Sequence, residues 1–368
     1  MSSHEEDFRS RRTHDARRVG VTRAGTSLGA VLTQQLRSGG HQVIGLGHAP
    51  ESPSGPSAEP SWRDTDLVSP EVVDALQDLD AVVHLTHGAH LSGELAEDPG
   101  VRRSRLVREM QTLTVASAAA GVRHLVVVTS AMVYGARPDN PVPLPEDSPL
   151  RSDDTEGMVA DLVEIEELLD RARDVHPAVL VTSVRPAALV GPGVDSIITR
   201  HFEAPRLLAL KGARPRWQFC HVEDLGRALG TVLDERLGPV VTVGAPGSLG
   251  LEQVEEISHL RHISVAPAAA HGAADRLHRL GVLPVPASDL AYVSSPWVVD
   301  SRRLVDHGWL ATHDNVDSLR VLLEEVRADR LARRVERKEA ALGAAGAASA
   351  AVAIVATAAL LRRRRNRT

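Results

Sequence analysis

Residues 22–29 form a short polar turn whose residue types suit phosphate binding. The turn reads Thr22-Arg23-Ala24-Gly25-Thr26-Ser27-Leu28-Gly29 and follows a β-branched run at 19–22. Apolar residues at helical spacing come next and stop at Gly39-Gly40, before a second apolar run at 43–46. The first turn of a helix offers free N–H groups and a positive dipole end, both of which favour anions. This strand, turn, helix and strand predict a nucleotide site near the N-terminus.

Three histidines, His84, His87 and His90, are a second group of side chains that could do chemistry, because imidazole nitrogens bind Zn²⁺ and related ions. Their spacing of i, i+3, i+6 spans a predicted strand end and a loop, so it fixes no facing geometry. The group also has no cysteine or acidic ligands of its own. We therefore expect no metal here.

The composition is that of a folded protein of one or two domains. The chain has 368 residues, 43% of them hydrophobic, and a net charge of −6. The hydrophobic content excludes a disordered chain, and the negative charge argues against a general nucleic-acid binder. The single Cys220 cannot form an internal disulfide. Residues 1–16 are charged and lack the apolar core of a signal peptide, so we expect a mobile tail.

Strands and helices alternate along the rest of the chain. The apolar strands at 81–85 and 123–129 are separated by a helix at 101–120, and another helix begins near Asp154. This alternation predicts an α/β fold with a doubly wound parallel sheet. Residues 48–63 are rich in Pro and Ser and are expected to be loop. Later elements are expected as helices at 71–77, 197–210, 222–234, 251–260 and 316–327 and a strand at 240–243.

Three motifs give the chain a specific resemblance. They are GVRHLVVVTSAMVYG at 121–135, SVRPAALVGPG at 183–193 and WQFCHVEDLGRAL at 217–229. Together with the N-terminal strand-turn-helix they resemble the NAD-dependent epimerase/dehydratase group of extended short-chain dehydrogenases, over about residues 17–325. The resemblance implies a Rossmann-type nucleotide-binding domain at 17–184 and an interleaved substrate-binding subdomain at 185–327.

The resemblance also implies which residues would meet NAD or NADP. In the family's T-G-x-x-G-x-x-G turn, Arg23 and Thr26 stand where the first two glycines belong, and only Gly29 is kept. At the end of the second strand, Gly47 and then His48 stand where an acid usually holds the ribose. We therefore expect cofactor binding to be weak or absent, with Arg23 as an alternative contact for a 2′-phosphate. The implied cofactor-binding residues are Thr22, Arg23, Thr26, Ser27, Leu28, Gly29, His48, Asp66, Leu67, Leu85 and Thr86.

The family's hydride transfer needs a Tyr and, four residues later, a Lys that lowers the pKa of the phenol. Ser130 matches the family's substrate-orienting serine, but the Tyr and Lys positions align with Met158 and Leu162. No Tyr-x-x-x-Lys occurs anywhere in the sequence, whose only tyrosines are Tyr134 and Tyr292. Tyr134 is interpreted as a packing residue.

Two carboxylates near the vacant tyrosine position could replace it as acid and base. Asp161 and Glu164 lie within two turns of Met158 on the predicted helix. The simpler interpretation is that they belong, with Glu156, Glu166 and Glu167, to the solvated face of an amphipathic helix.

Two functions from different classes follow. The first is an NAD(P)-dependent oxidoreductase or epimerase acting on a sugar nucleotide or a similar small molecule with a non-standard acid/base. The second, which the missing Tyr and Lys favour, is a catalytically degenerate relative that binds an unidentified small ligand or acts as a scaffold. A homodimer is left open as a further partner.

The C-terminal segment predicts a membrane anchor. After a basic linker at 328–339, residues 340–361 carry no charge, and a basic tail at 362–368 follows. As a helix, 22 residues reach about 33 Å, enough for a hydrocarbon core of about 30 Å. Twelve of them are alanine, so an Ala-rich soluble helix is the alternative. Without a signal peptide, the folded domain is expected in the cytoplasm, anchored to the cell membrane.

Overall fold

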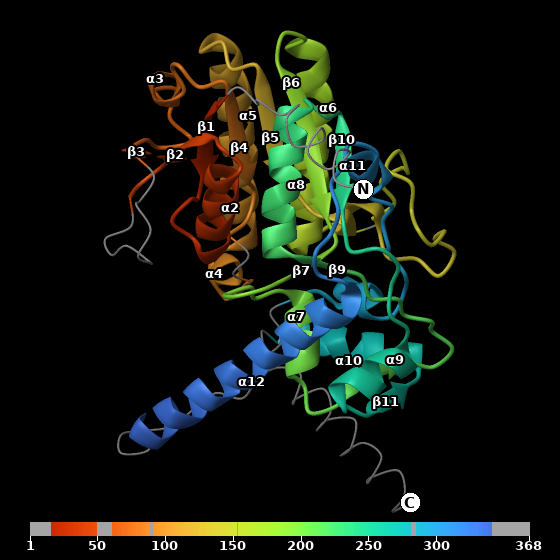
Figure 1. Cartoon of the computed structure of the whole chain (residues 1–368). Coiled ribbons are helices and arrows are strands. Elements are labelled where there is room, and N and C mark those ends of the chain that lie inside the picture. Colours follow the sequence, from red (N-terminus) through yellow and green to blue (C-terminus); the bar gives the residue numbers. More distant parts are fainter. Residues whose placement is uncertain (1–15, 50–60, 89–90, 153, 281–284, 341–368) are drawn as a thin grey trace, which may run out of the picture.

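One parallel sheet of seven strands organises the fold. A computed structural model describes residues 16–49, 61–88, 91–152, 154–280 and 285–340. The strand order is β10-β6-β5-β4-β1-β2-β3, so the order reverses beside β1 (Figure 1). Ligands of such sheets bind at the carboxyl ends of the strands near this reversal. The strands are β1 Arg18–Thr22, β2 Gln42–Leu46, β3 Ser61–Arg63, β4 Ala81–Leu85, β5 His124–Val128, β6 Leu180–Pro186 and β10 Val240–Val243.

Helices cover both faces of the sheet. On one face α2 (Ser27–Ser38) packs against α8 (Val222–Asp234), and on the other α5 (Pro99–Ala119) packs against α6 (Gly157–Val175) (Figure 1). In β5, Val126 and Val128 join the core beneath α2 and α8, whereas Leu125 and Val127 join the core beneath α5 and α6. Successive strand residues point to opposite faces, so an apolar strand needs cover on both. The predicted doubly wound α/β fold is confirmed.

Most of the later elements, β7, β9, α7, α9, α10, β11 and α12, lie beyond the carboxyl ends of the main strands, whereas α3 lies at the other end of the sheet (Figure 1). Two small parallel sheets pair β7 with β9 and β8 with β11. The strand β10 returns from this part of the chain to the main sheet. The bounds are α3 Val72–Ala75, α4 Leu91–Ala96, η1 Ala131–Tyr134, β7 Ala188–Val190, α7 Ile197–Glu203, β8 Leu207–Leu210, β9 Phe219–His221, α9 Leu251–Ser258, β11 His262–Val265, α10 Pro267–Arg279, η2 Ala287–Val293, α11 Arg302–Asp306 and α12 Asn315–Ala340.

Three segments differ from the sequence prediction. The helix expected at 316–327 continues through the predicted basic linker at 328–339, so that α12 runs from Asn315 to Ala340. The helix expected at 197–210 ends at Glu203, and Leu207–Leu210 forms the strand β8. Ala204 precedes Pro205 and is extended, with ψ 148°, because the proline ring disfavours a helical conformation in the residue before it. The loop expected at 48–63 contains β3, which pairs with β2 at the sheet edge. Residues 50–60 of that loop lie outside the described residues.

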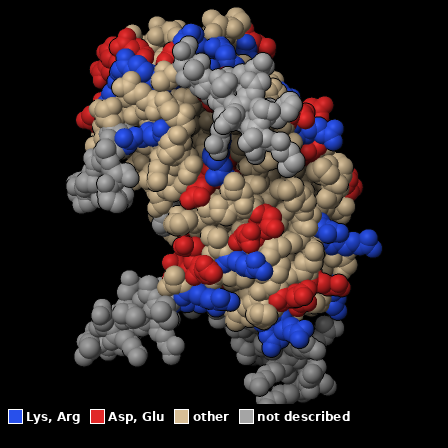
Figure 2. Space-filling model, viewed as in Figure 1, with Lys and Arg blue, Asp and Glu red and all other residues tan. Residues whose placement is uncertain are grey.

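Two properties bear on the partners expected from the sequence: the distribution of charge on the surface, and the length and apolarity of the helices. On the face drawn in Figure 2, acidic and basic side chains are interspersed rather than gathered into a field of one sign. No helix within the described ranges is long and apolar enough to cross a membrane. The predicted span at 340–361 lies, apart from its first residue, outside the described residues, as does the tail at 362–368.

Candidate functional site

The turn between β1 and α2 has a backbone conformation that normally requires glycine. Arg23 adopts φ +52°, in the left-handed region, which costs a side-chain-bearing residue roughly 1 kcal/mol. A Cβ at Gly29 would lie 2.1 Å from the carbonyl oxygen of Arg23, so only glycine fits there. Because α2 approaches the turn closely at Gly29, a glycine is required at this position. Arg23 stands in the first glycine place with a left-handed backbone conformation.

The Arg23 side chain is held inside the protein. Its Nη1 donates to the carbonyl oxygen of Leu85 at 2.6 Å, and its Nη2 donates to Oε2 of Glu109 at 2.7 Å. Glu109 also accepts from Nη1 of Arg105 at 3.1 Å. The guanidinium thus ties the turn to the end of β4 and to α5. This position disfavours the predicted contact with a 2′-phosphate.

Thr26 begins α2 and fills space beside the turn. Its Oγ1 donates to the carbonyl oxygen of Arg23 at 2.9 Å and accepts from the N–H of Gly29 at 3.1 Å. Its methyl carbon lies so near Gly88 that a Cβ built there would be 3.2 Å away. Thr26 therefore brings the turn into contact with the loop after β4, where a glycine would leave room for a pyrophosphate.

The N-terminus of α2 retains one feature of a phosphate site. Within the described ranges, the N–H groups of Ser27 and Leu28 donate to no protein acceptor, and Ser27 is exposed. Free N–H groups at a helix N-terminus bind anions.

Thr22, Leu85 and Thr86 join neighbouring strand ends. Oγ1 of Thr22 accepts from the N–H of Leu85 at 3.0 Å and lies 3.0 Å from Nδ1 of His84. Burial lowers the pKa of His84 well below its ordinary value, so this imidazole is a neutral core group. Oγ1 of Thr86 donates to the carbonyl oxygen of Val128 at 2.8 Å. Of the three histidines considered as metal ligands, His90 lies outside the described residues.

The residues expected near the adenosine lie on the sheet edge. Nδ1 of His48 is 2.6 Å from Oδ1 of Asp64, with both side chains about four-fifths exposed. Oδ1 of Asp66 accepts from the N–H of Val68 at 3.1 Å, which closes a local turn. Leu67 packs against the core beneath α5 and α6. None of these side chains lines the pocket described next.

A pocket of about 130 Å³ opens at the carboxyl ends of β4, β5 and β6. It brings together six residues that the sequence singled out: Leu28, Thr86, His87, Ser130, Met158 and Leu162. Most of its other walls are apolar, from residues 186–189, 194 and 197–198 and from Trp297. Pockets for drug-sized ligands are typically about 300–1,000 Å³, so this one suits a small ligand.

Ser130 and Tyr134 have local structural roles. Oγ of Ser130 accepts from the N–H of Met132 at 3.2 Å and begins η1, and Ser130 also lines the pocket. Tyr134 is fully buried, and its hydroxyl donates to the carbonyl oxygen of Glu146 at 2.7 Å. Burial raises the pKa of this phenol, although the Arg185 guanidinium, 4.8 Å from the ring centre, opposes the rise. A buried phenol with this partner fits packing.

The interpretation of the α6 carboxylates as a solvated face is wrong for two of them. Asp161 is buried, and its carboxylate accepts from Nε of Arg102 and from Nε of Arg103, each at 2.8 Å. Glu166 is also buried, and Arg185 binds it through Nε at 2.9 Å and Nη2 at 2.7 Å. Both carboxylate oxygens of Asp161 are bonded to arginine side chains, and Asp161 does not line the pocket, so it does not suit the role of a replacement acid.

His87 lines the same pocket, and its pairing with Glu94 was not predicted from the sequence. Nδ1 of His87 lies 3.5 Å from Oε2 of Glu94, and neither ring nitrogen makes a hydrogen bond within the described part of the chain. Burial opposes ionisation of Glu94, but the neighbouring His87, Arg23 and Arg105 lower the pKa of its carboxyl to about 2. The side chain of His87 lines the pocket, but both of its ring nitrogens are covered by protein atoms, so a ligand reaches them only if neighbouring side chains move. The six residues between His87 and Glu94 gave no periodic signal that would have paired them.

The site fits a nicotinamide dinucleotide only in part. The free N–H groups at the start of α2 suit a phosphate, as does the tight turn that Gly29 permits. The side chain of Thr26 occupies the approach to the turn, and apolar Met158 and Leu162 line the pocket at the positions aligned with Tyr and Lys. Neither a phenol nor an amine therefore lines the described pocket at these two positions.

Comparison with known families identifies the class of protein. The sequence profile of the NAD dependent epimerase/dehydratase family matches residues 21–244, more than half of the chain. The chain belongs to this family.

Mycobacterial proteins resemble the chain over part of its length. Uncharacterized proteins of Mycobacterium tuberculosis (strain ATCC 25618 / H37Rv) and Mycobacterium bovis are each 25% identical over 230 residues, which is 62% of this chain. The chain spans about half the length of these curated relatives, since the match covers 54% of each.

Several solved structures share the fold. An NAD-dependent NDP-hexosamine 5,6-dehydratase of tunicamycin biosynthesis is 20% identical, with a TM-score of 0.62 over 85% of this chain and 98% of that one. A UDP-glucose 4-epimerase of Thermotoga maritima, solved with UDP-glucose, is 15% identical, with a TM-score of 0.61 over 85% and 99%. MoeE5, solved with UDP-glucuronic acid and NAD, is 23% identical, with a TM-score of 0.59 over 84% and 99%.

Proposed function

We propose that this chain is a ligand-binding member of its family that does not carry out Tyr-dependent hydride transfer. The proposal rests on the side chains that α6 contributes to the pocket wall. Met158 and Leu162 line the pocket at the positions aligned with the family's Tyr and Lys. A thioether and an isobutyl group neither accept nor donate a proton, so the acid/base step has no group there.

The ligand that this pocket suits is compact and mainly apolar, with one hydrogen-bonding group. The walls are largely aliphatic, and Ser130 contributes a hydroxyl group to the lining. A sugar nucleotide is larger and more polar than this space. NAD or NADP binding is proposed to be weak, because the side chain of Thr26 lies where a backbone should approach the pyrophosphate.

Titration of the purified full-length chain tests this function. Trp297 lines the pocket, so tryptophan fluorescence can report occupancy as NADH or NADPH is added. We expect no saturation at micromolar concentrations and no reduction of NAD when UDP-glucose is supplied. Tight NADH binding together with turnover that Ser130→Ala abolishes would overturn the proposal.

The pair of His87 and Glu94 favours a second candidate, an enzyme with a different acid/base. An imidazole beside an ionised carboxylate can exchange a proton with a bound substrate, and Ser130 lines the same pocket. This candidate predicts turnover that His87→Gln abolishes and Glu164→Gln, at a half-exposed position outside the pocket, leaves unchanged. Equal loss in both variants, or no turnover, would reject it.

We further propose that residues 340–361 anchor the chain at the cell membrane, with the folded domain in the cytoplasm. The support is the uncharged segment itself, flanked on both sides by basic residues. Basic side chains near the ends of a span interact with anionic lipid headgroups.

A further inference from the structure

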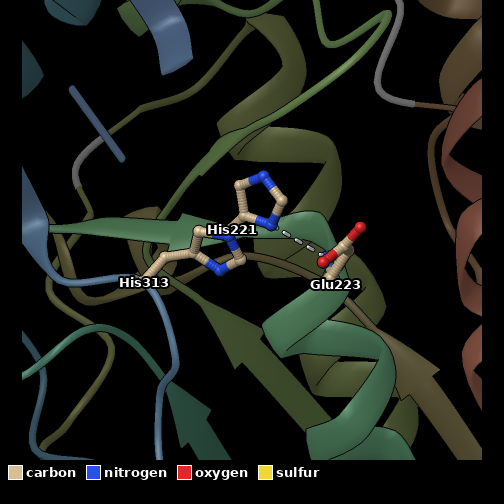
Figure 3. A group of neighbouring side chains, drawn as sticks. All are labelled: His221, Glu223 and His313. Carbon is tan, nitrogen blue, oxygen red and sulfur yellow. Dashed lines mark hydrogen bonds between the residues drawn. The ribbon is translucent and has the colours of Figure 1, made fainter. Parts of the chain in front are cut away.

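A second cluster of chemically capable side chains lies away from the pocket, at the start of α8. His221 ends β9, Glu223 lies in the first turn of α8, and His313 lies just before α12. One nitrogen from each imidazole and one carboxylate oxygen all lie within 4.8 Å of one another. Figure 3 shows the two rings lying against each other, with the Glu223 side chain beside them. Segments about 90 residues apart in sequence thus place three metal-ligand groups together.

The two imidazole rings are stacked. Their centres are 3.7 Å apart and their planes are inclined by 23°. Burial and the adjacent His313 lower the pKa of His221 to about 4. Two charged rings at this separation would repel, whereas two neutral rings each keep one nitrogen lone pair.

A buried carboxylate orients His313. Oδ2 of Asp224 lies 3.1 Å from Nδ1 of His313 and accepts from the backbone N–H of the same residue at 3.0 Å. A proton held on Nδ1 by Asp224 leaves the lone pair on Nε2. Carboxylates behind histidine ligands fix the tautomer in metal sites in the same way.

His221 already caps α8 through a hydrogen bond, and a metal ion that binds the imidazole would displace this bond. Its Nδ1 accepts from the N–H of Glu223 at 3.3 Å and caps α8. Coordination through Nε2 places the ring proton on Nδ1 and gives up this bond. The bond is longer than the usual 2.9–3.0 Å of N–H hydrogen bonds, so little is lost.

We propose that His221, Glu223 and His313 bind a divalent transition-metal ion, with Zn²⁺ as the best match. Two imidazoles and one carboxylate are a known zinc ligand set, in which the fourth position is left to water or another ligand. The side chain of His313 is 27% exposed and Glu223 is partly exposed, so an ion can enter from solvent. The site is separate from the pocket and does not depend on the proposed function.

Bound metal would join the start of α8 to the segment that leads into α12. This junction is otherwise made by Asp224, which also accepts from the N–H of Thr312 at 2.8 Å. An ion that binds only the folded state stabilises it in proportion to the logarithm of its concentration. Occupancy should therefore raise the unfolding temperature.

Metal binding by the untagged full-length chain, first stripped with a chelator, tests the site. We expect one Co²⁺ per chain with the visible absorption of a four- or five-coordinate ion, displaced by Zn²⁺, and a higher unfolding temperature with either ion. Glu223→Gln and His313→Gln should each weaken Zn²⁺ binding by about tenfold or more. His221→Asn should do the same, since Asn keeps a helix-capping oxygen but replaces the imidazole.

A matched control separates this site from adventitious binding. His262 and Glu255 form another His–carboxylate pair, with Nδ1 of His262 3.0 Å from Oε1 of Glu255. His262→Gln should leave Co²⁺ binding and the metal-dependent unfolding temperature unchanged. Absence of Co²⁺ binding, or equal binding by wild type, Glu223→Gln and His313→Gln, would overturn the proposal. If His221→Asn does not fold, the other two variants still decide it.

Discussion

Nη2 of Arg23 donates to Oε2 of Glu109 at 2.7 Å, which ties the first glycine place of the turn to the middle of α5. The two side chains are only 16% and 8% exposed, so the pair is shielded from water. An arginine in this place is thus a structural replacement for the glycine, and it needs both the carboxylate partner and a left-handed backbone.

Substitution of Arg23 should affect stability more than nucleotide binding. Arg23→Ala leaves Glu109 with one fewer partner and keeps φ +52°, so we expect a loss of about 1–3 kcal/mol in the free energy of unfolding. Arg23→Gly loses the same contacts but relieves the backbone, and should be about 1 kcal/mol more stable than Arg23→Ala. Urea unfolding measures both. An NADPH affinity that falls sharply in both variants would instead support a 2′-phosphate contact.

Opening the turn at Thr26 should strengthen dinucleotide binding. Thr26→Gly removes the side chain near Gly88 and costs only a few tenths of a kcal/mol as a helix cap. We expect NADH affinity, measured by calorimetry, to rise about tenfold, because backbone can then approach the pyrophosphate. Thr26→Val is the matched control, since it keeps a methyl group beside Gly88 and should not strengthen binding. No gain in Thr26→Gly would show that Thr26 does not limit binding.

His87→Leu should stabilise the protein and remove a ligand contact. A buried imidazole without hydrogen bonds carries a desolvation cost, so an apolar side chain of similar size should raise the free energy of unfolding by about 1 kcal/mol. Residues kept for binding at the expense of stability behave in this way. Leu162→Val, another change in the pocket wall, should instead cost about 1 kcal/mol. A clear loss of stability in His87→Leu would mean that the imidazole has a structural role.

The sequence predicted the elements whose patterns are local. The run at 81–85 is β4 and the helix at 222–234 is α8, both with the bounds expected, because each is a continuous apolar or amphipathic pattern. The run Leu207–Leu210 was expected to be helical and is a strand, since four apolar residues fit either period.

The site was less predictable because its pairs are distant in sequence. Arg23 and Glu109 are separated by 86 positions, and Asp161 meets Arg102 across 59. Carboxylates on an amphipathic helix look solvated until a buried partner from another helix or strand is known. The motifs did bring Ser130, Met158 and Leu162 to one pocket, because the family alignment includes the tertiary arrangement that local patterns omit.

Removal of the C-terminal segment should release the protein from membranes. The full-length chain should sediment with membranes and resist carbonate washing, whereas a chain ending at Arg334 should be extracted. The 12 alanines in residues 340–361 make insertion weaker than for a leucine-rich span, so partial extraction of the full-length chain is also expected. Identical extraction of the two chains would contradict the anchor and favour an Ala-rich soluble helix.

The buried pair of Glu166 and Arg185 should make stability depend on acid pH. Burial opposes ionisation of Glu166, but bonds from Arg185, Ser183 and Thr129 hold its pKa below the ordinary value. A lowered folded-state pKa gives stability that is complete above the unfolded-state pKa, about 4.3, and is lost as the pH falls through the folded-state pKa.

Glu166→Gln measures that contribution. At neutral pH the variant leaves Arg185 buried without its charge partner, so we expect the free energy of unfolding to fall by about 3–5 kcal/mol. The gap between wild type and variant should narrow below about pH 4, as the wild-type carboxylate becomes protonated. Glu164→Gln, on the same helix but 40% exposed, should change stability by less than about 0.5 kcal/mol at any pH. A gap for Glu166→Gln that stays constant between neutral and acid pH would show that the charge of Glu166 is not what stabilises this pair.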